Sequence, residues 1–187
     1  MRIAVVTAAL PTRAQQLAEA CYTVAAQTVQ PVHHLIGVDY AREGSAATRN
    51  RLVFASDADW VAFLDDDDLL YRNHLEVLAG LADACADIAY TGCDVSGREG
   101  WNPYRPFDAD ALRAGNYIPA TVLIRRSLFV SLGGFRPSTE VAHGWEDWDL
   151  WLRALSVGAV FRSSEEKTWQ YRFHEGCKTY RGEEECY

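Results

Sequence analysis

The fold is decided by the stretch WVAFLDDDD at residues 60–68, in which an apolar run passes directly into four aspartates. The apolar part, Trp60 to Leu64, is typical of a buried strand, so the carboxylates follow its carboxyl end. Ligands of open α/β sheets bind at this edge. Two carboxylates about 6 Å apart repel by roughly 3 kcal/mol at an effective dielectric of about 20, so a run of four needs a reason. The stretch therefore indicates a divalent cation that carries a phosphorylated ligand, with a solvated acidic turn as the alternative.

Strand and helix patterns alternate on either side of this stretch. Strands are predicted at Arg2–Thr7, His34–Val38, Trp60–Leu64 and Ile88–Cys93, and helices in the segments that begin near Thr12, Ser45 and Asn73. We expect capping boxes at two of these helix starts, pairing Thr12 with Gln15 and Asn73 with Glu76. The order predicts an α/β fold with a mostly parallel central sheet flanked by helices.

The second half of the chain lacks this alternation. It predicts, in order, an aromatic loop at Glu99–Phe107, a strand at Thr121–Arg125, helices at Ser127–Leu132 and Glu146–Leu155, and short closing strands at Ala159–Phe161 and Thr168–Phe173. With 187 residues, of which 49% are hydrophobic, the chain is long enough to bury one core. We therefore expect a single domain.

Composition and charge exclude several classes of function. A net charge of −8 argues against non-specific binding to nucleic acid, which calls for a basic face. No apolar run approaches the ~18 residues of a membrane span, and the N-terminus lacks a signal-peptide pattern. Neither a P-loop nor a GxGxxG motif occurs. We therefore expect a cytoplasmic protein with no membrane span.

The five cysteines show neither a CxxC pair nor zinc-site spacing, so they are interpreted as reduced thiols. Three of them are expected to pack in the core, and Cys85 is placed on the inner face of the third predicted helix. A disulfide between Cys177 and Cys186 is left open. The acidic residues Glu183–Glu185 are expected to form a frayed tail.

A series of short segments occurs in a fixed order along the chain: Val5–Thr7 with Pro11–Arg13, Ala26–Thr28, Val38–Asp39, Ala47–Asn50, Phe63–Asp68, Gly133–Phe135, Trp145–Trp148 and Tyr171–His174. In this order and spacing they resemble the inverting nucleotide-sugar glycosyltransferases of family 2, and Asp65 and Asp67 match the DxD motif of that family. The resemblance implies one GT-A (Rossmann-like) domain over residues 1–187. Residues 1–94 would bind the nucleotide sugar, and residues 95–187 would bind the acceptor and carry the catalytic base.

The resemblance also implies a donor site at the ends of the first strands. Its donor-binding residues would be Thr7, Arg13, Asp39, Arg49, Asp65 and Asp66. Asp39 would accept a hydrogen bond from a base N–H, as uracil offers, and Asp66 would support the ribose. Asp67 would bind Mn²⁺ or Mg²⁺ with Asp65 and His174 as further ligands, because a hard cation bridges diphosphate oxygens and neutralises the leaving group. Asp68 is expected to be a helix-side or turn residue.

The expected catalytic residues are Asp147 and its neighbour Glu146, at the start of a predicted helix. Asp147 would take the proton of an acceptor hydroxyl as its oxygen attacks the anomeric carbon. The alternative is that both carboxylates only complement the helix dipole. Acceptor contacts are expected from the Glu99–Tyr117 region and the Pro137–Gly144 loop, with aromatic rings able to stack on a sugar. The acceptor-binding candidates are Trp101, Tyr117, Trp145 and Trp148.

The predicted function is metal-dependent, inverting transfer of one sugar from a nucleotide-diphosphate sugar to a hydroxyl acceptor, with UDP as the leading nucleotide. Two departures from the family pattern matter: Tyr40–Gly44 replaces the acidic-Gly-Ser continuation of the second strand, and no QxxRW motif follows Asp147, which argues against processive synthesis. One alternative is a haloacid-dehalogenase-like phosphatase, although its DxD motif lies on the first strand rather than the third. The other is a nucleotide-sugar-binding protein without turnover. The sugar, the acceptor and a homodimeric state are left open.

Overall fold

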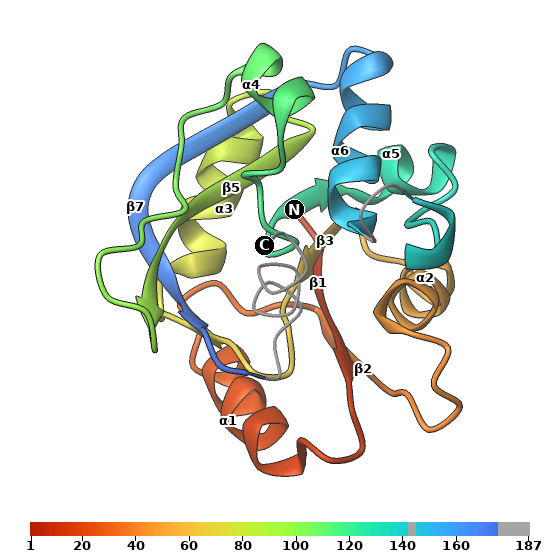
Figure 1. The fold of residues 1–187 in the computed structure, drawn as a ribbon, viewed down its shortest axis with the longest axis vertical. Coiled ribbons are helices and arrows are strands. Elements are labelled where there is room, and N and C mark those ends of the chain that lie inside the picture. Colours follow the sequence, from red (N-terminus) through yellow and green to blue (C-terminus); the bar gives the residue numbers. More distant parts are fainter. Residues whose placement is uncertain (142–144, 176–187) are drawn as a thin grey trace.

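The structure is a computed structural model that describes residues 1–141 and 145–175. Its strands are β1 (Ile3–Ala9), β2 (His33–Val38), β3 (Trp60–Phe63), β4 (Leu69–Leu70), β5 (Ile88–Ser96), β6 (Leu123–Arg125) and β7 (Phe161–Arg172). Its helices are α1 (Ala14–Ala25), α2 (Ser45–Ala55), α3 (His74–Asp83), α4 (Ala109–Ala114), α5 (Arg126–Ser131) and α6 (Glu146–Ser156), with a short 3₁₀ helix at Ser138–Glu140. Figure 1 shows the sheet running through the molecule with helices on both faces.

Several predictions fall outside the described residues. These are the Cys177–Cys186 pairing, the Glu183–Glu185 tail and the last three residues of the Pro137–Gly144 loop. Among the described residues, no helix combines the length and the apolar character needed to cross a membrane.

The strands form one mixed sheet in the order β2-β1-β3-β6-β5-β7-β4. β1 runs parallel to both β2 and β3, and β5 runs parallel to β7. β6 lies antiparallel between β3 and β5, and β4 is antiparallel to β7. The parallel pairing of β1 and β3 brings their carboxyl ends to one edge, and the four aspartates leave the sheet there.

Two apolar clusters pack on the two faces of the sheet. Successive residues of β3 alternate between them, with Val61 and Phe63 in one cluster and Trp60 and Ala62 in the other. The first cluster includes residues of α2, α5 and α6, and the second includes residues of α1 and α3. Because helices cover both faces, all four residues of β3 are buried, as its uninterrupted apolar pattern predicted.

One long strand, β7, replaces the two short closing strands that the sequence predicted. Its polar middle, Ser163–Lys167, carries no apolar alternation, which is why the sequence indicated a break there. β5 stays paired with β7 on both sides of this polar part because the register shifts before and after Gly92. A Cβ at Gly92 would lie only 2.7 Å from the carbonyl oxygen of Glu165, so the bulge requires glycine.

Neither predicted capping box forms. Residue 13, not Thr12, precedes α1, and its side chain makes no capping bond. At α3 the Asn73 side chain donates to Glu166 at 2.6 Å, while Glu76 accepts from Thr28 at 2.8 Å. At this helix start both side chains therefore bond to residues of other segments, and the local pairing does not form. The prediction for Cys85 is also wrong: it is exposed, in a left-handed conformation with φ of 67°, just beyond the end of α3.

A side-chain clamp joins two of the segments that the sequence singled out. Asn50 of α2 accepts the N–H of Phe135 at 2.9 Å and donates to its carbonyl at 2.7 Å. Gly134 adopts a φ of 74°, and a Cβ there would collide with the Asn50 amide. The clamp fixes the chain that leaves α5 against α2, on the same side of the sheet as α6.

Candidate active site at the carboxyl end of the sheet

The first two aspartates after β3 point in different directions. Asp65 is partly exposed and forms an ion pair with the buried Arg49 of α2. Asp66 is buried and accepts from the Leu10 N–H at 2.7 Å and from Arg13 Nη1 at 2.9 Å. Asp66 therefore orders the turn between β1 and α1, so both its oxygens already have partners.

The other two aspartates face the end of β7. Asp67 is buried and pairs with Arg13, and its Oδ2 lies 3.0 Å from His174 Nε2. Asp68 is almost completely buried and accepts the backbone N–H of Arg172 at 2.9 Å. The Arg172 side chain in turn donates to the Asp67 carbonyl. The Tyr171–His174 segment thus closes over the aspartates from the far end of the sheet.

Three of the four carboxylates could hold a metal ion together. Asp65, Asp67 and Asp68 offer ligand oxygens that lie within 4.8 Å of one another. A cluster of carboxylate oxygens suits a hard divalent cation. Asp68, which was expected to be a helix-side or turn residue, thus also contributes a buried carboxylate to the cluster.

The electrostatics of this cluster favour a cation. Burial raises the pKa of Asp67 and the charge of Asp65 raises it further, while Arg13 opposes the change. Burial and the charge of Asp65 likewise raise the pKa of Asp68 well above its usual range. Carboxyl groups that resist ionisation beside one another are stabilised in their charged form by a nearby positive charge.

Arg49 joins the aspartates to the start of α6. Its guanidinium is buried, packs over the Phe135 ring, pairs with Asp65 and lies 3.8 Å from Glu146 Oε1. Ser45 of α2 donates to the same Glu146 oxygen at 2.7 Å. Arg49 therefore contacts two acidic residues from different elements, one of them in the DxD turn.

Asp147 lies in the first turn of α6, beside Glu146. It is half-buried, and its Oδ1 accepts the N–H of Trp148 at 2.8 Å and Asn116 Nδ2 at 3.2 Å. Burial, together with the neighbouring Glu146 charge, raises the pKa of Asp147 to about 6. A carboxylate with a pKa near the working pH is well matched to proton transfer.

Asp39 and Thr7 already have protein partners. Asp39, directly after β2, is buried and accepts the N–H groups of Glu43 and Gly44 at 2.9 and 2.8 Å. It therefore orders the loop before α2. Thr7 is fully buried in β1 and its hydroxyl lies 3.0 Å from His34 Nε2.

The four aromatic candidates fall into two groups. Trp101 packs edge-on against Tyr171 and Phe173, at 5.8 and 5.9 Å between ring centroids, so it lies at the His174 end of β7. Trp145 and Trp148 pack together at 5.7 Å beside Asp147, and the Trp145 ring is the exposed one.

The remaining aromatic candidate, Tyr117, serves the fold. Its hydroxyl accepts the N–H of Asp108 at 2.8 Å and donates to the carbonyl of the same residue at 3.0 Å. The Arg105 guanidinium lies over its ring. Tyr117 thus holds the start of α4.

Comparison with known sequences identifies the family. The sequence model described as "Glycosyl transferase family 2" matches residues 22–138. The chain belongs to glycosyl transferase family 2. The pre-mycofactocin glycosyltransferases of two Mycobacterium tuberculosis strains, CDC 1551 / Oshkosh and H37Rv, are each 33% identical to it over 136 residues. That match covers 64% of this chain and 28% of either relative, so the chain spans only a small part of their length.

Solved structures with the same fold include Staphylococcus aureus TarS. TarS residues 1–349 in complex with UDP-GlcNAc superpose with a TM-score of 0.74 at 15% identity, covering 95% of this chain and 60% of TarS 1–349. A longer TarS structure gives 0.73 at 13% identity, covering 94% of this chain and 37% of that one. The predicted GT-A α/β class and the family 2 resemblance are therefore confirmed. Family 2 membership also argues against the phosphatase alternative.

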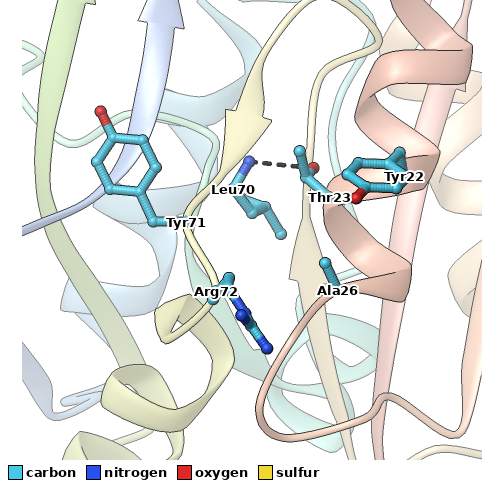
Figure 2. Close-up of a pocket in the computed structure, with 6 residues that line it drawn as sticks. All are labelled: Tyr22, Thr23, Ala26, Leu70, Tyr71 and Arg72. Carbon is cyan, nitrogen blue, oxygen red and sulfur yellow. Dashed lines mark hydrogen bonds between the residues drawn. The ribbon is translucent and has the colours of Figure 1, made fainter.

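This family 2 protein has a separate groove on the outer side of the sheet edge. It encloses about 530 Å³ between α1 and the chain around β4, and Figure 2 shows its lining residues Tyr22, Thr23, Ala26, Leu70, Tyr71 and Arg72. The Thr23 hydroxyl accepts the Leu70 N–H at 3.2 Å, which covers part of the sheet edge. The lining contains none of the predicted site residues, so the groove is distinct from the carboxylate cluster.

Two site residues of this family 2 protein escaped the sequence interpretation. Arg172 lies in the Tyr171–His174 segment, but only its backbone and side-chain bonds to Asp68 and Asp67 reveal its role. Asn116 contacts Asp147 across 31 residues of sequence and belongs to no motif that could have marked it.

Replacing Arg49 tests whether its guanidinium links Asp65 to Glu146. Arg49→Met should lower the free energy of unfolding by roughly 3 kcal/mol, because it removes the buried positive charge that faces Asp65 and Glu146. The matched control is Arg51→Met on the same helix, whose exposed pair with Glu43 should contribute less than about 1 kcal/mol. Urea unfolding measures the free energy of unfolding of both variants. Equal losses of stability would contradict the link from Asp65 through Arg49 to Glu146.

Proposed function

We propose that this protein is a metal-dependent, inverting glycosyltransferase that moves one sugar from a nucleotide-diphosphate sugar, with UDP as the nucleotide, to a hydroxyl acceptor. The observation that carries the proposal is the side-chain connection between the aspartate cluster and Asp147. The carboxylates of Asp65, Asp67 and Asp68 can hold a cation, and Arg49 connects them through Glu146 to the half-buried Asp147. The names of the relatives support the class of reaction, and the UDP-GlcNAc complex of TarS supports the class of donor.

In this proposal residues 1–94 bind the donor and residues 95–187 supply the base and the acceptor contacts. Asp39 and Thr7 shape the nucleotide end of the site by ordering the ends of β2 and β1. Arg13 and Asp66 fix the turn after β1 beside the diphosphate. The exposed Trp145, packed on Trp148 next to Asp147, offers a ring face to an acceptor.

Asp65, Asp67 and Asp68 would hold the divalent cation, with His174 within reach of the same Asp67 oxygen. When bound, the cation supplies positive charge to the diphosphate oxygens and so stabilises the leaving group. Arg13 and Arg172 keep the aspartate turn in the conformation that presents these oxygens.

Asp147 acts as the general base. Its Oδ1 is held by two hydrogen bonds, and its carboxylate takes the proton of the acceptor hydroxyl. The acceptor oxygen then forms a bond to the anomeric carbon while the bond from that carbon to the diphosphate oxygen breaks on the opposite side. The nucleoside diphosphate leaves with the electron pair, and the configuration at the anomeric carbon is inverted.

Binding of Mn²⁺ separates the aspartates by role. Asp67→Asn and Asp68→Asn should each weaken Mn²⁺ binding in the presence of UDP by roughly tenfold or more, since loss of a supporting partner alone can cost that much. Asp66→Asn is the matched control and should bind Mn²⁺ much as the unchanged protein does, because Asp66 faces Leu10 and Arg13. Isothermal titration calorimetry measures the affinities. A loss confined to Asp66→Asn would contradict the assignment.

The pH dependence of donor hydrolysis tests the base. With water as the acceptor, kcat/KM for UDP release should fall as the pH drops through about 6, because the base must be ionised and the pKa of Asp147 is raised to about 6. Asp147→Asn should lose roughly 10²-fold or more of this rate and still bind UDP with Mn²⁺.

The control for Asp147→Asn lies two residues further along α6. Asp149 is already engaged by Arg136 and Arg153, so Asp149→Asn should retain the rate and its pH profile. Undiminished UDP release by Asp147→Asn would exclude Asp147 as the base.

A further inference from the structure

Asn116 contacts the carboxylate of Asp147 from a different element. It lies between α4 and β6 and donates from Nδ2 to Asp147 Oδ1 at 3.2 Å. The other end of its amide, Oδ1, is buried and has no hydrogen-bond partner in the part of the chain that the structure describes. Among these residues the amide thus uses its donor on Asp147 and leaves its acceptor unpaired.

Two tryptophans of α6 fix the backbone on either side of Asn116. The indole N–H of Trp148 donates to the carbonyl of Leu112 at 2.7 Å, and that of Trp151 donates to the carbonyl of Ile118 at 3.0 Å. Leu112, Ile118 and Trp151 are fully buried. The segment that carries Asn116 is therefore tied to α6 at both ends, which holds the amide opposite the first turn of that helix.

The unpaired amide oxygen makes Asn116 a poor choice for stability alone. A buried acceptor without a partner loses its hydration and gains nothing in return. A leucine of similar shape would avoid that loss. We therefore look for the contribution of this asparagine in its hydrogen bond to Asp147.

We propose that Asn116 is a positioning residue for Asp147: its amide engages Oδ1 and leaves Oδ2 as the oxygen that takes the acceptor proton. This inference rests on the proposed function, in which Asp147 is the base. With Trp148 N–H on the same Oδ1, no donor from the described residues is bonded to Oδ2.

The groups that face Asp147 determine the direction in which its pKa shifts when the Asn116 amide is removed. Glu146, from α6 itself, raises the pKa of Asp147, while Arg49 from α2 lowers it. The Asn116 amide also lowers it, because it donates to the ionised form. Loss of the amide should therefore raise the pKa of Asp147 further above 6.

The test is Asn116→Leu, with Asn116→Ala as a second variant should the leucine not fold. Carbon-13 NMR of protein labelled at its aspartate carboxyl groups follows the Asp147 titration directly, with the resonance assigned by its absence in Asp147→Asn. Either variant should move that titration, and the acid limb of UDP release, upward by about one pH unit. Asn116→Leu should not lower the melting temperature.

The control is Asn102→Leu, because Asn102 is exposed and, within residues 1–141 and 145–175, its side chain bonds only to the Tyr104 N–H of its own loop. It should leave the Asp147 titration in place. An unchanged Asp147 titration in Asn116→Leu and Asn116→Ala would overturn the positioning role. Failure of the proposed function shows separately, as undiminished UDP release by Asp147→Asn, because the NMR titration does not depend on turnover.

Discussion

The rest of the site depends on one buried guanidinium. Arg49 sits inside the protein between Asp65, at the end of β3, and Glu146, at the start of α6. A buried cation is tolerated only when it is paired, and so are the acids beside it. These three side chains therefore require one another, and they join the aspartate cluster to the start of α6, which carries Asp147. The planar guanidinium of arginine presents its N–H donors in a fixed fork, which suits it to two carboxylates that approach from different elements.

The same principle explains how four adjacent aspartates coexist. Each has its own positive or N–H partner: Arg49 for Asp65, Leu10 and Arg13 for Asp66, Arg13 and His174 for Asp67, and Arg172 for Asp68. These partners come from both ends of the chain, so the turn is shaped by tertiary contacts. Three of the carboxylates nevertheless remain clustered, and the raised pKa values of Asp67 and Asp68 show that the protein alone does not fully balance their charge.

The sequence predicted those parts of the fold in which local pattern and tertiary structure agree. The uninterrupted apolar run of β3 is buried on both faces, and the segments around Asp65 and Asp147 lie at the strand and helix ends where they were expected. The sequence-based prediction was wrong where contacts with residues distant in the sequence determine the local structure. Asn73 turns to Glu166 in place of a local cap, and bulges keep the polar part of β7 in the sheet.

The candidate site divides in the same way. The identities of Asp65, Asp67 and Asp147 follow from motifs within a few residues of each, so the family resemblance could place them. Arg49 and Arg172 lie in segments that the resemblance marked, whereas Asn116 lies in none. The contacts of all three cross 16 to 105 residues of sequence and do not follow from local pattern. Charge balance and side-chain hydrogen bonding, which depend on the folded geometry, therefore supply what the motifs leave out.

If Asp147 is the base, it directs an acceptor oxygen to the face of the sugar opposite the diphosphate. Proton NMR of the anomeric signal during slow hydrolysis of UDP-GlcNAc, the sugar nucleotide bound in the TarS structure, with Mn²⁺ present, reports the configuration of the released sugar. Because the donor is α-linked, β-configured sugar should appear first and then equilibrate. Sugar released first in the α configuration would exclude inversion.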